Sequence, residues 1–202
     1  PVTEDQSLKP ESPYAASKLM AEQVLHWFGL TRGTRHVALR YFNASGAAAD
    51  GTLGDEYKPA TRIIPVLMEY LLGQREQFLI YGDDYPTPDG TCVRDYIHVD
   101  DLATAHVAAL RYLADGQQST QFNLGTGQGY SNRQIVEAVK ECTGLDFDVQ
   151  FGARRPGDPP MIWADNRKAR ALLDWIPRYG LREIVEHAWR WHRTHPDGYQ
   201  SA

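Results

Sequence analysis

Segments with helical periodicity alternate with short β-branched and aromatic segments along this chain, and the alternation restricts it to an α/β fold. Ser12 and Pro13 supply an N-cap and a first-turn proline, apolar residues recur at helical spacing across 14–28, and Gly29 predicts the end of that helix. The segment 36–42 is β-branched and aromatic, as is typical of a strand. The chain therefore opens with a helix followed by a strand.

The same alternation continues toward the C-terminus. We predict helices at residues 62–72, 99–114, 131–143, 166–173 and 181–195, and strands at 78–82, 121–124 and 147–151. Segments 44–59, 83–91 and 154–160 are rich in Gly, Pro and Asp, which predicts irregular loops. Long loops often carry functional residues.

Charge and apolar patterning limit the partners. The formal net charge is −5 and the basic residues are scattered, so we expect no nucleic-acid partner. Residues 1–10 lack the basic start and apolar centre of a signal peptide, and the apolar stretches are too short to cross a bilayer. We therefore expect a cytoplasmic protein with no membrane partner.

The cysteines and histidines do not form a metal-binding pattern. Cys92 and Cys142 are far apart without CxxC spacing, which favours reduced, packed thiols. His98 and His106 have no cluster of carboxylates or cysteines beside them, so packed or helix-capping roles are the simpler interpretation. We predict no metal.

Tyr14 and Lys18 are four residues apart on the first predicted helix, so their side chains project from one face. The ammonium can favour the phenolate by direct charge interaction, which makes a usable acid/base pair. A bare Y-x-x-x-K pattern is weak, because a tyrosine and a lysine on a helix surface need no function. Whether Tyr14 and Lys18 are catalytic therefore depends on the surrounding sequence.

Five longer strings supply that context. They are Ser-Pro-Tyr-Ala-Ala-Ser-Lys at 12–18, Leu-Arg-Tyr-Phe-Asn at 39–43, Tyr-Gly-Asp-Asp-Tyr-Pro-Thr-Pro-Asp-Gly-Thr-Cys-Val-Arg-Asp-Tyr-Ile-His-Val at 81–99, Asn-Leu-Gly at 123–125 and Arg-Arg-Pro-Gly-Asp-Pro-Pro at 154–160. In this order and spacing they resemble the UDP-glucose 4-epimerases, which are extended short-chain dehydrogenase/reductases. The resemblance covers nearly the whole chain, and the string at 81–99 is its most specific part.

The resemblance implies interconversion of UDP-galactose and UDP-glucose with NAD as a tightly held cofactor. Tyr14 would deprotonate the sugar 4-hydroxyl while hydride leaves C4, and the 4-keto sugar would turn and take the hydride back on its other face. Lys18 would hold the nicotinamide ribose, and Tyr41 would also lie at the cofactor. The resemblance further implies a homodimer for the full-length form.

The same resemblance assigns the diphosphate to Arg94 and Arg155, since a planar guanidinium can take phosphate oxygens in bidentate fashion. The alternative is a surface ion pair with Asp95 or Asp158, for which Arg154 is the stronger candidate.

Further substrate contacts are implied for Asn43 at the UDP-sugar, Ile63 and Tyr81 near the uracil, and Asp158 at the ribose. For Tyr81, a packed aromatic side chain at a strand end is an equally good interpretation. Ile162 falls where side-chain size governs room for a 2-acetamido group. Its intermediate size predicts a preference for UDP-glucose and UDP-galactose with some turnover of UDP-GlcNAc.

The resemblance also predicts an α/β fold in two parts, a remnant of a Rossmann-type parallel sheet and a mixed α/β substrate-binding domain. Residues 1–43, with 121–125 returning to their sheet, would be the C-terminal portion of a truncated NAD-binding Rossmann domain, and 44–202 would bind the UDP-sugar. No G-x-G-x-x-G turn follows a strand here, and 125–129 lacks the unit that a dinucleotide site needs. We therefore expect the glycine loop upstream of Pro1.

Two alternatives stay open. The chain could be an inert UDP-sugar-binding module, because half of the cofactor site is missing and the chain alone is expected to be inactive. It could also belong to a related nucleotide-sugar 4,6-dehydratase or decarboxylase, against which the string at 81–99 argues.

Overall fold

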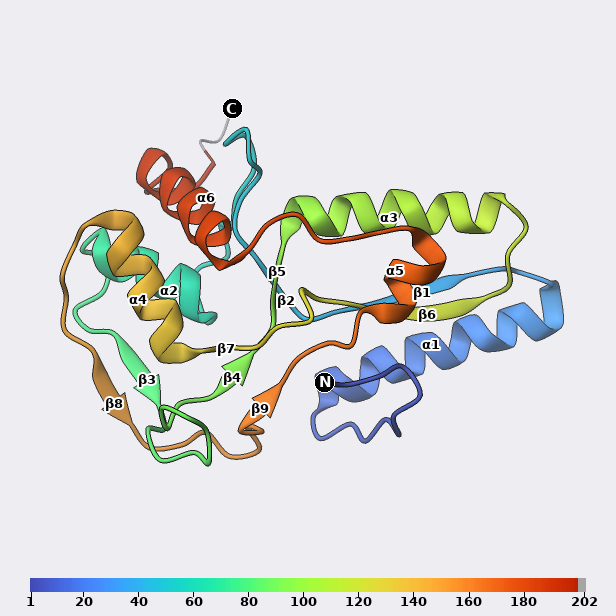
Figure 1. Ribbon diagram of the computed structural model, residues 1–202, viewed down its shortest axis with the longest axis horizontal. Coiled ribbons are helices and arrows are strands. Elements are labelled where there is room, and N and C mark those ends of the chain that lie inside the picture. Colours follow the sequence, from blue (N-terminus) through green and yellow to red (C-terminus); the bar gives the residue numbers. More distant parts are fainter. Residues whose placement is uncertain (200–202) are drawn as a thin grey trace.

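The computed structural model describes residues 1–199, and Figure 1 shows the arrangement of their helices and strands. The helices are α1 (Pro13–Arg32), α2 (Ile63–Leu71), α3 (Val99–Ala114), α4 (Asn132–Thr143), α5 (Arg167–Leu173) and α6 (Leu181–Thr194). The strands are β1 (Val37–Tyr41), β2 (Asn43–Ser45), β3 (Leu79–Tyr81), β4 (Val93–Arg94), β5 (Tyr96–His98), β6 (Thr120–Leu124), β7 (Tyr130–Ser131), β8 (Gln150–Gly152) and β9 (Met161–Ile162). The α/β class predicted from the sequence is confirmed.

Most strand pairs are parallel. β1 pairs with β6, β2 with β5 and β3 with β8, all in parallel, while β4 lies between antiparallel β7 and parallel β9. The β1–β6 register places Val37 opposite Thr120 and Tyr41 opposite Leu124. In Figure 1 this pair runs between α3 and α1.

Helix α1 is attached to the sheet by charge more than by burial. None of its residues is fully buried, and the Arg40 Nε on β1 donates to Glu22 of α1 at 2.7 Å. By contrast, α2, α4 and α6 pack on one another at the opposite end of the molecule (Figure 1).

Two hydrophobic cores lie on either side of β5. Successive side chains of a strand point to opposite faces, so Tyr96 enters one core and Ile97 enters the other. The Tyr96 core joins α2, α4, α6 and β3, and the Ile97 core joins α3, α5 and β6. Strand β5 thereby ties the two parts of the fold together.

The structure corrects several predicted boundaries. α1 does not end at Gly29 but continues to Arg32, where Gly33 at φ 67 forms a left-handed cap whose N–H bonds to the Gly29 carbonyl. Of Gly29 and Gly33, it is Gly33 that has the left-handed backbone that stops a helix. The predicted helix at 99–114 is confirmed residue for residue.

The other predicted helices shift by one residue at one or both ends, and the short strands differ more. The strand predicted at 147–151 is shorter and later, at 150–152, and the loop predicted from residue 44 begins with β2. β4, β5, β7 and β9 have only two or three residues each, too few for a period-2 pattern to be visible in the sequence.

Candidate active site

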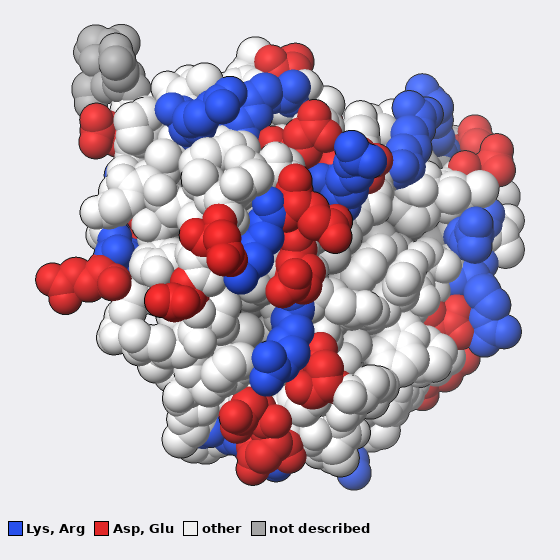
Figure 2. Space-filling view, turned by 60° about the vertical axis from the view of Figure 1, so that its left-hand side comes forward, with Lys and Arg blue, Asp and Glu red and all other residues white. Residues whose placement is uncertain are grey.

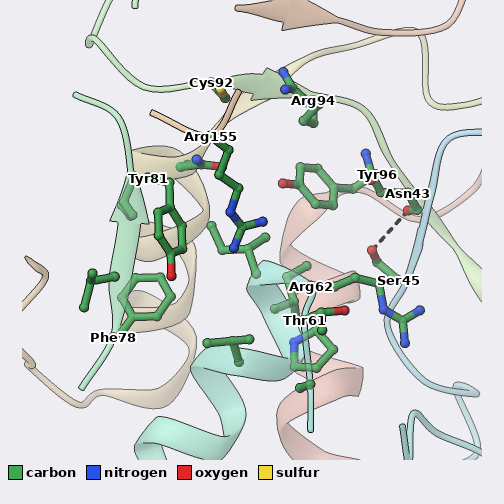
Figure 3. Close-up of a pocket in the computed structure, with 18 of the residues that line it drawn as sticks. Asn43, Ser45, Thr61, Arg62, Phe78, Tyr81, Cys92, Arg94, Tyr96 and Arg155 are labelled. Carbon is green, nitrogen blue, oxygen red and sulfur yellow. Dashed lines mark hydrogen bonds between the residues drawn. The ribbon is translucent and has the colours of Figure 1, made fainter. Parts of the chain in front are cut away.

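Six of the seven predicted substrate residues line one cavity of about 570 Å³ (Figure 3). They come from β2, the start of α2, β3, β4 and the loop after β8, and are Asn43, Ile63, Tyr81, Arg94, Arg155 and Asp158. Segments that are far apart in the sequence therefore meet here.

Arg155 reaches into this cavity without a carboxylate partner. Its guanidinium lies 4.1 Å from the centre of the Tyr81 ring, and no ion pair within residues 1–199 includes Arg155. Figure 3 shows its side chain extending toward the middle of the cavity. Tyr81 is thus a packing surface for Arg155, and Arg155 is a positive charge available to an anion.

Arg94 Nη2 lies 3.5 Å from Asp158 Oδ1, with side chains that are 16% and 41% exposed, so the alternative ion pair with Asp158 is present for Arg94. Arg154, the stronger candidate for that pairing, instead pairs with Asp84 at 2.6 Å, outside the cavity lining. Arg94 and Arg155 both remain cavity residues.

Sequence reasoning missed a set of hydrogen bonds in the cavity wall, made by Ala60, Glu69 and Arg75. Glu69 accepts from the Ala60 N–H at 3.2 Å and pairs with Arg75, and Arg75 donates to the Ala60 carbonyl at 2.6 Å. These hydrogen bonds fix Thr61 and Arg62, which line the cavity. A buried glutamate inside the otherwise apolar 63–71 helix is the sequence signal that could have revealed them.

Tyr14, Lys18 and Tyr41 line a second hollow of about 530 Å³ between α1 and β1. Lys18 Nζ lies 5.1 Å from the centre of the Tyr14 ring, and Tyr14 is 72% exposed. A phenol and an ammonium are therefore adjacent and accessible, which is the chemistry of an acid/base pair.

The β1–β2 junction connects the two hollows. Tyr41 ends β1 at one hollow, and Asn43 begins β2 at the other. Two residues of extended chain span about 7 Å. Asn43 is held by two donations to the Asp95 carbonyl, from its backbone N at 3.2 Å and its Nδ2 at 2.7 Å.

The Asp95 side chain explains the glycine turn after β6. Its carboxylate accepts the N–H groups of Thr126, Gly127 and Ala164, so these donors are already satisfied inside the protein. A Cβ on Gly125 would lie 2.3 Å from Asp95 Oδ2. Burial raises the pKa of the Asp95 carboxyl, and the donated hydrogen bonds oppose that rise.

Ile162 is the predicted substrate residue that does not line the cavity. It lies on β9, opposite Arg94 in the β4–β9 register, and its side chain is half-buried.

Surface charge is mixed: on the face shown in Figure 2, acidic and basic side chains are interspersed.

The two histidines considered as metal ligands make local hydrogen bonds. His98 accepts from the Asp100 N–H, and His106 Nδ1 bonds to the Leu102 carbonyl. Across residues 1–199, no helix has the length and apolarity to cross a membrane, and no three His, Cys, Asp or Glu side chains form a metal-binding group.

Comparison with protein families matches residues 1–188 to the family described as GDP-mannose 4,6 dehydratase. Among curated proteins, a UDP-glucose 4-epimerase of Lacticaseibacillus casei is 46% identical over 200 residues, covering 98% of this chain and 60% of that protein. The chain thus spans about 60% of the length of the curated relatives it matches.

Solved structures show the same similarity. The UDP-glucose 4-epimerase of Brucella ovis in complex with NAD is 45% identical with a TM-score of 0.90, covering 94% of this chain and 58% of that one. The UDP-glucose 4-epimerase of Bifidobacterium longum in complex with NAD+ and UDP is 35% identical with a TM-score of 0.91, covering 98% and 60%.

Proposed function

Because this chain belongs to the GDP-mannose 4,6 dehydratase family, we propose that its protein acts on nucleotide sugars as an NAD-dependent UDP-glucose 4-epimerase. The observation that carries the proposal is the cavity in which, among residues 1–199, Arg155 has no carboxylate partner and Arg94 has a single one. A guanidinium free to pair is suited to a diphosphate. The relatives named UDP-glucose 4-epimerase support the choice of reaction.

Binding of the substrate is the role of the cavity. Arg94 and Arg155 hold the diphosphate, Tyr81 and Ile63 lie at the uracil, and Asp158 at the ribose. With the nucleotide fixed, the sugar is directed past Asn43 toward the hollow that holds Tyr14.

Proton transfer is the role of the other hollow. Its donor set, an exposed phenol, an ammonium and a tyrosine ring, fits the nicotinamide end of NAD, which Tyr14, Lys18 and Tyr41 would hold. NAD, when bound, supplies the acceptor and donor of the hydride at C4. Tyr14 removes the proton from the sugar 4-hydroxyl and returns it, and the Lys18 ammonium stabilises the phenolate in between.

Product analysis tests this proposal directly. Full-length protein supplied with NAD and UDP-galactose is expected to form UDP-glucose and to reach a mixture of both sugars. The family description makes a 4,6-dehydratase the second candidate, and this enzyme would release water and leave a 4-keto-6-deoxy sugar. Detection of that product without epimer would replace the proposal, and UDP binding without turnover would support an inert binding module.

Ile162 favours UDP-glucose and UDP-galactose over UDP-GlcNAc, which a comparison of kcat/KM checks. Exposed apolar side chains on α1, including Met20, Val24 and Trp27, support a homodimer of the full-length form, which light scattering would detect. The division into a Rossmann portion (1–43 with 121–125) and a UDP-sugar domain (44–202), and a cytoplasmic location, are retained as proposals.

A further inference from the structure

The cavity arginines differ in how their charge is balanced. Arg62 pairs with Asp55 at 2.5 Å and Arg75 pairs with Glu69, and neither carboxylate lines the cavity. Asp158 is the acidic residue among the cavity-lining residues, and it lies 3.5 Å from Arg94. Within residues 1–199, Asp158 thus carries the negative charge that the cavity itself presents.

The Arg94–Asp158 contact is weak enough for another anion to replace the Asp158 carboxylate at Arg94. Charge-assisted N–H···O bonds are about 2.7–2.9 Å long, so a 3.5 Å separation is an ion pair without a good hydrogen bond. No other side-chain partner of the Asp158 carboxylate is found in the described chain, whereas Glu69 also holds the Ala60 backbone. Partly exposed pairs of this kind stabilise a fold weakly.

The loop that carries Asp158 is pinned on both sides of it. Arg154 is held by Asp84, and the Pro160 carbonyl accepts from the Val93 N–H at 2.9 Å. Between these anchors lies Gly157 at φ 82, beside Asp158. The loop can therefore move Asp158 locally without losing its attachment.

We propose that Asp158 is a positioning residue that acts as the internal counterion of Arg94: it holds the guanidinium at the cavity in the free protein and yields it to a diphosphate. The nature of that ligand rests on the proposed function. The carboxylate stands in for a phosphate oxygen, so the charge of Arg94 is balanced at the cavity before the ligand arrives, while Arg94 Nη1 donates to the Val93 carbonyl at 2.9 Å. The same carboxylate repels any anion that has no ribose whose hydroxyls could donate hydrogen bonds to Asp158.

Inorganic pyrophosphate is the probe that isolates this effect, because it has the anionic P–O–P group and no ribose. By calorimetry on the full-length protein, Asp158→Asn is expected to bind pyrophosphate about 3- to 10-fold more tightly than the unmodified protein. Asp83→Asn is the matched control, since it removes an exposed carboxylate next to Asp84 that neither lines the cavity nor anchors the loop, and should leave that affinity unchanged.

A double variant shows whether the gain acts through Arg94. In Arg94→Gln with Asp158→Asn, the tighter pyrophosphate binding should be lost. Equal or weaker pyrophosphate binding in Asp158→Asn overturns the proposal, as does a gain that persists in the double variant. UDP binding to the unmodified protein, measured alongside, tests the proposed function separately: its absence would reject the nucleotide site and leave the pyrophosphate comparison valid.

Discussion

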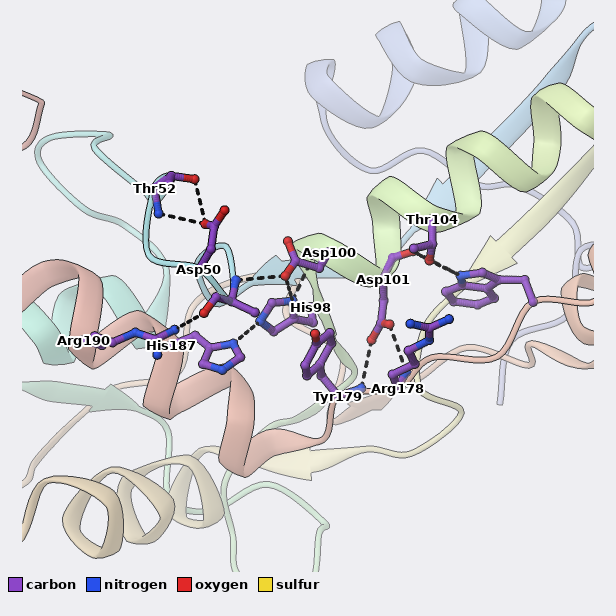
Figure 4. A network of polar contacts seen from close by, with 12 residues as sticks. Asp50, Thr52, His98, Asp100, Asp101, Thr104, Arg178, Tyr179, His187 and Arg190 are labelled. Carbon is purple, nitrogen blue, oxygen red and sulfur yellow. Dashed lines mark hydrogen bonds and ion pairs between the residues drawn. The ribbon is translucent and has the colours of Figure 1, made fainter.

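His98 is a histidine whose tautomer is fixed by its neighbours (Figure 4). Its Nδ1 accepts the Asp100 N–H at 3.0 Å, so the proton resides on Nε2, which lies 2.9 Å from His187 Nδ1. The ring of Tyr179 packs on the imidazole, with the two ring centres 4.2 Å apart. Protonation of His98 would add a proton to Nδ1, the atom that caps α3. It would also place a positive charge at a site that is not exposed to solvent.

This geometry predicts an acid-sensitive fold. Burial lowers the pKa of His98 from 6.5 to about 4, with the Asp100 charge opposing and His187 assisting that shift. Between pH 6.5 and 4, His98 therefore binds a proton in the unfolded chain but stays neutral in the folded protein. The contribution of neutral His98 to the free energy of unfolding is fully present above pH 6.5. It falls by up to about 3 kcal/mol as the pH drops toward 4.

Urea unfolding between pH 7.5 and 4.5 checks this, with His98→Gln as the comparison. The variant should be less stable at pH 7.5 but should lose less stability on acidification. A residual slope is expected from His192, whose pKa is also lowered by burial. Identical slopes in the two proteins would contradict the assignment to His98.

At the scale of elements, the two serine N-caps of α1 and α4 offer a matched pair. Ser131 Oγ accepts from Gln134 N at 3.1 Å, completes a capping box and also bonds to Asp89, all in a buried position. Ser12 Oγ accepts from Ala15 N at 3.1 Å at the exposed start of a helix with no buried residue. The same bond length thus occurs in two environments.

Alanine at each cap should therefore have unequal effects. Ser131→Ala is expected to lower the free energy of unfolding by about 2 kcal/mol, because it also removes the hydrogen bond to Asp89 Oδ2, and Ser12→Ala by about 0.5 kcal/mol. Thermal or urea unfolding of both variants gives the comparison. Equal losses, or a larger loss at Ser12, would show that the tertiary setting of the cap does not matter.

At the scale of the whole molecule, local signals predicted the helices and long-range contacts determined the rest. Helix α3 was predicted residue for residue because Asp100 and Asp101 open it with the charge that a helix N-terminus favours. The cavity could be anticipated only through resemblance, since its lining residues run from Asn43 to Asp158. No periodicity brings such distant positions together.

Asp95 shows why part of the site escaped prediction. Its carboxylate bonds to backbone groups 31, 32 and 69 residues away in the sequence, at Thr126, Gly127 and Ala164. Beside Arg94 it looked like a surface ion-pair partner, but it is buried and organises the turn after β6. A side chain that serves distant backbone donors leaves no local pattern in the sequence.

The proposed epimerisation depends on the phenol of Tyr14, and its most direct test is the rate at which full-length Tyr14→Phe converts UDP-galactose to UDP-glucose. We predict a fall in kcat of at least about 100-fold with little change in UDP affinity, because a general base is lost while the cavity is untouched. Tyr57→Phe, which alters an exposed tyrosine in the loop before α2, should retain full activity. Undiminished conversion by Tyr14→Phe would contradict the proposed chemistry.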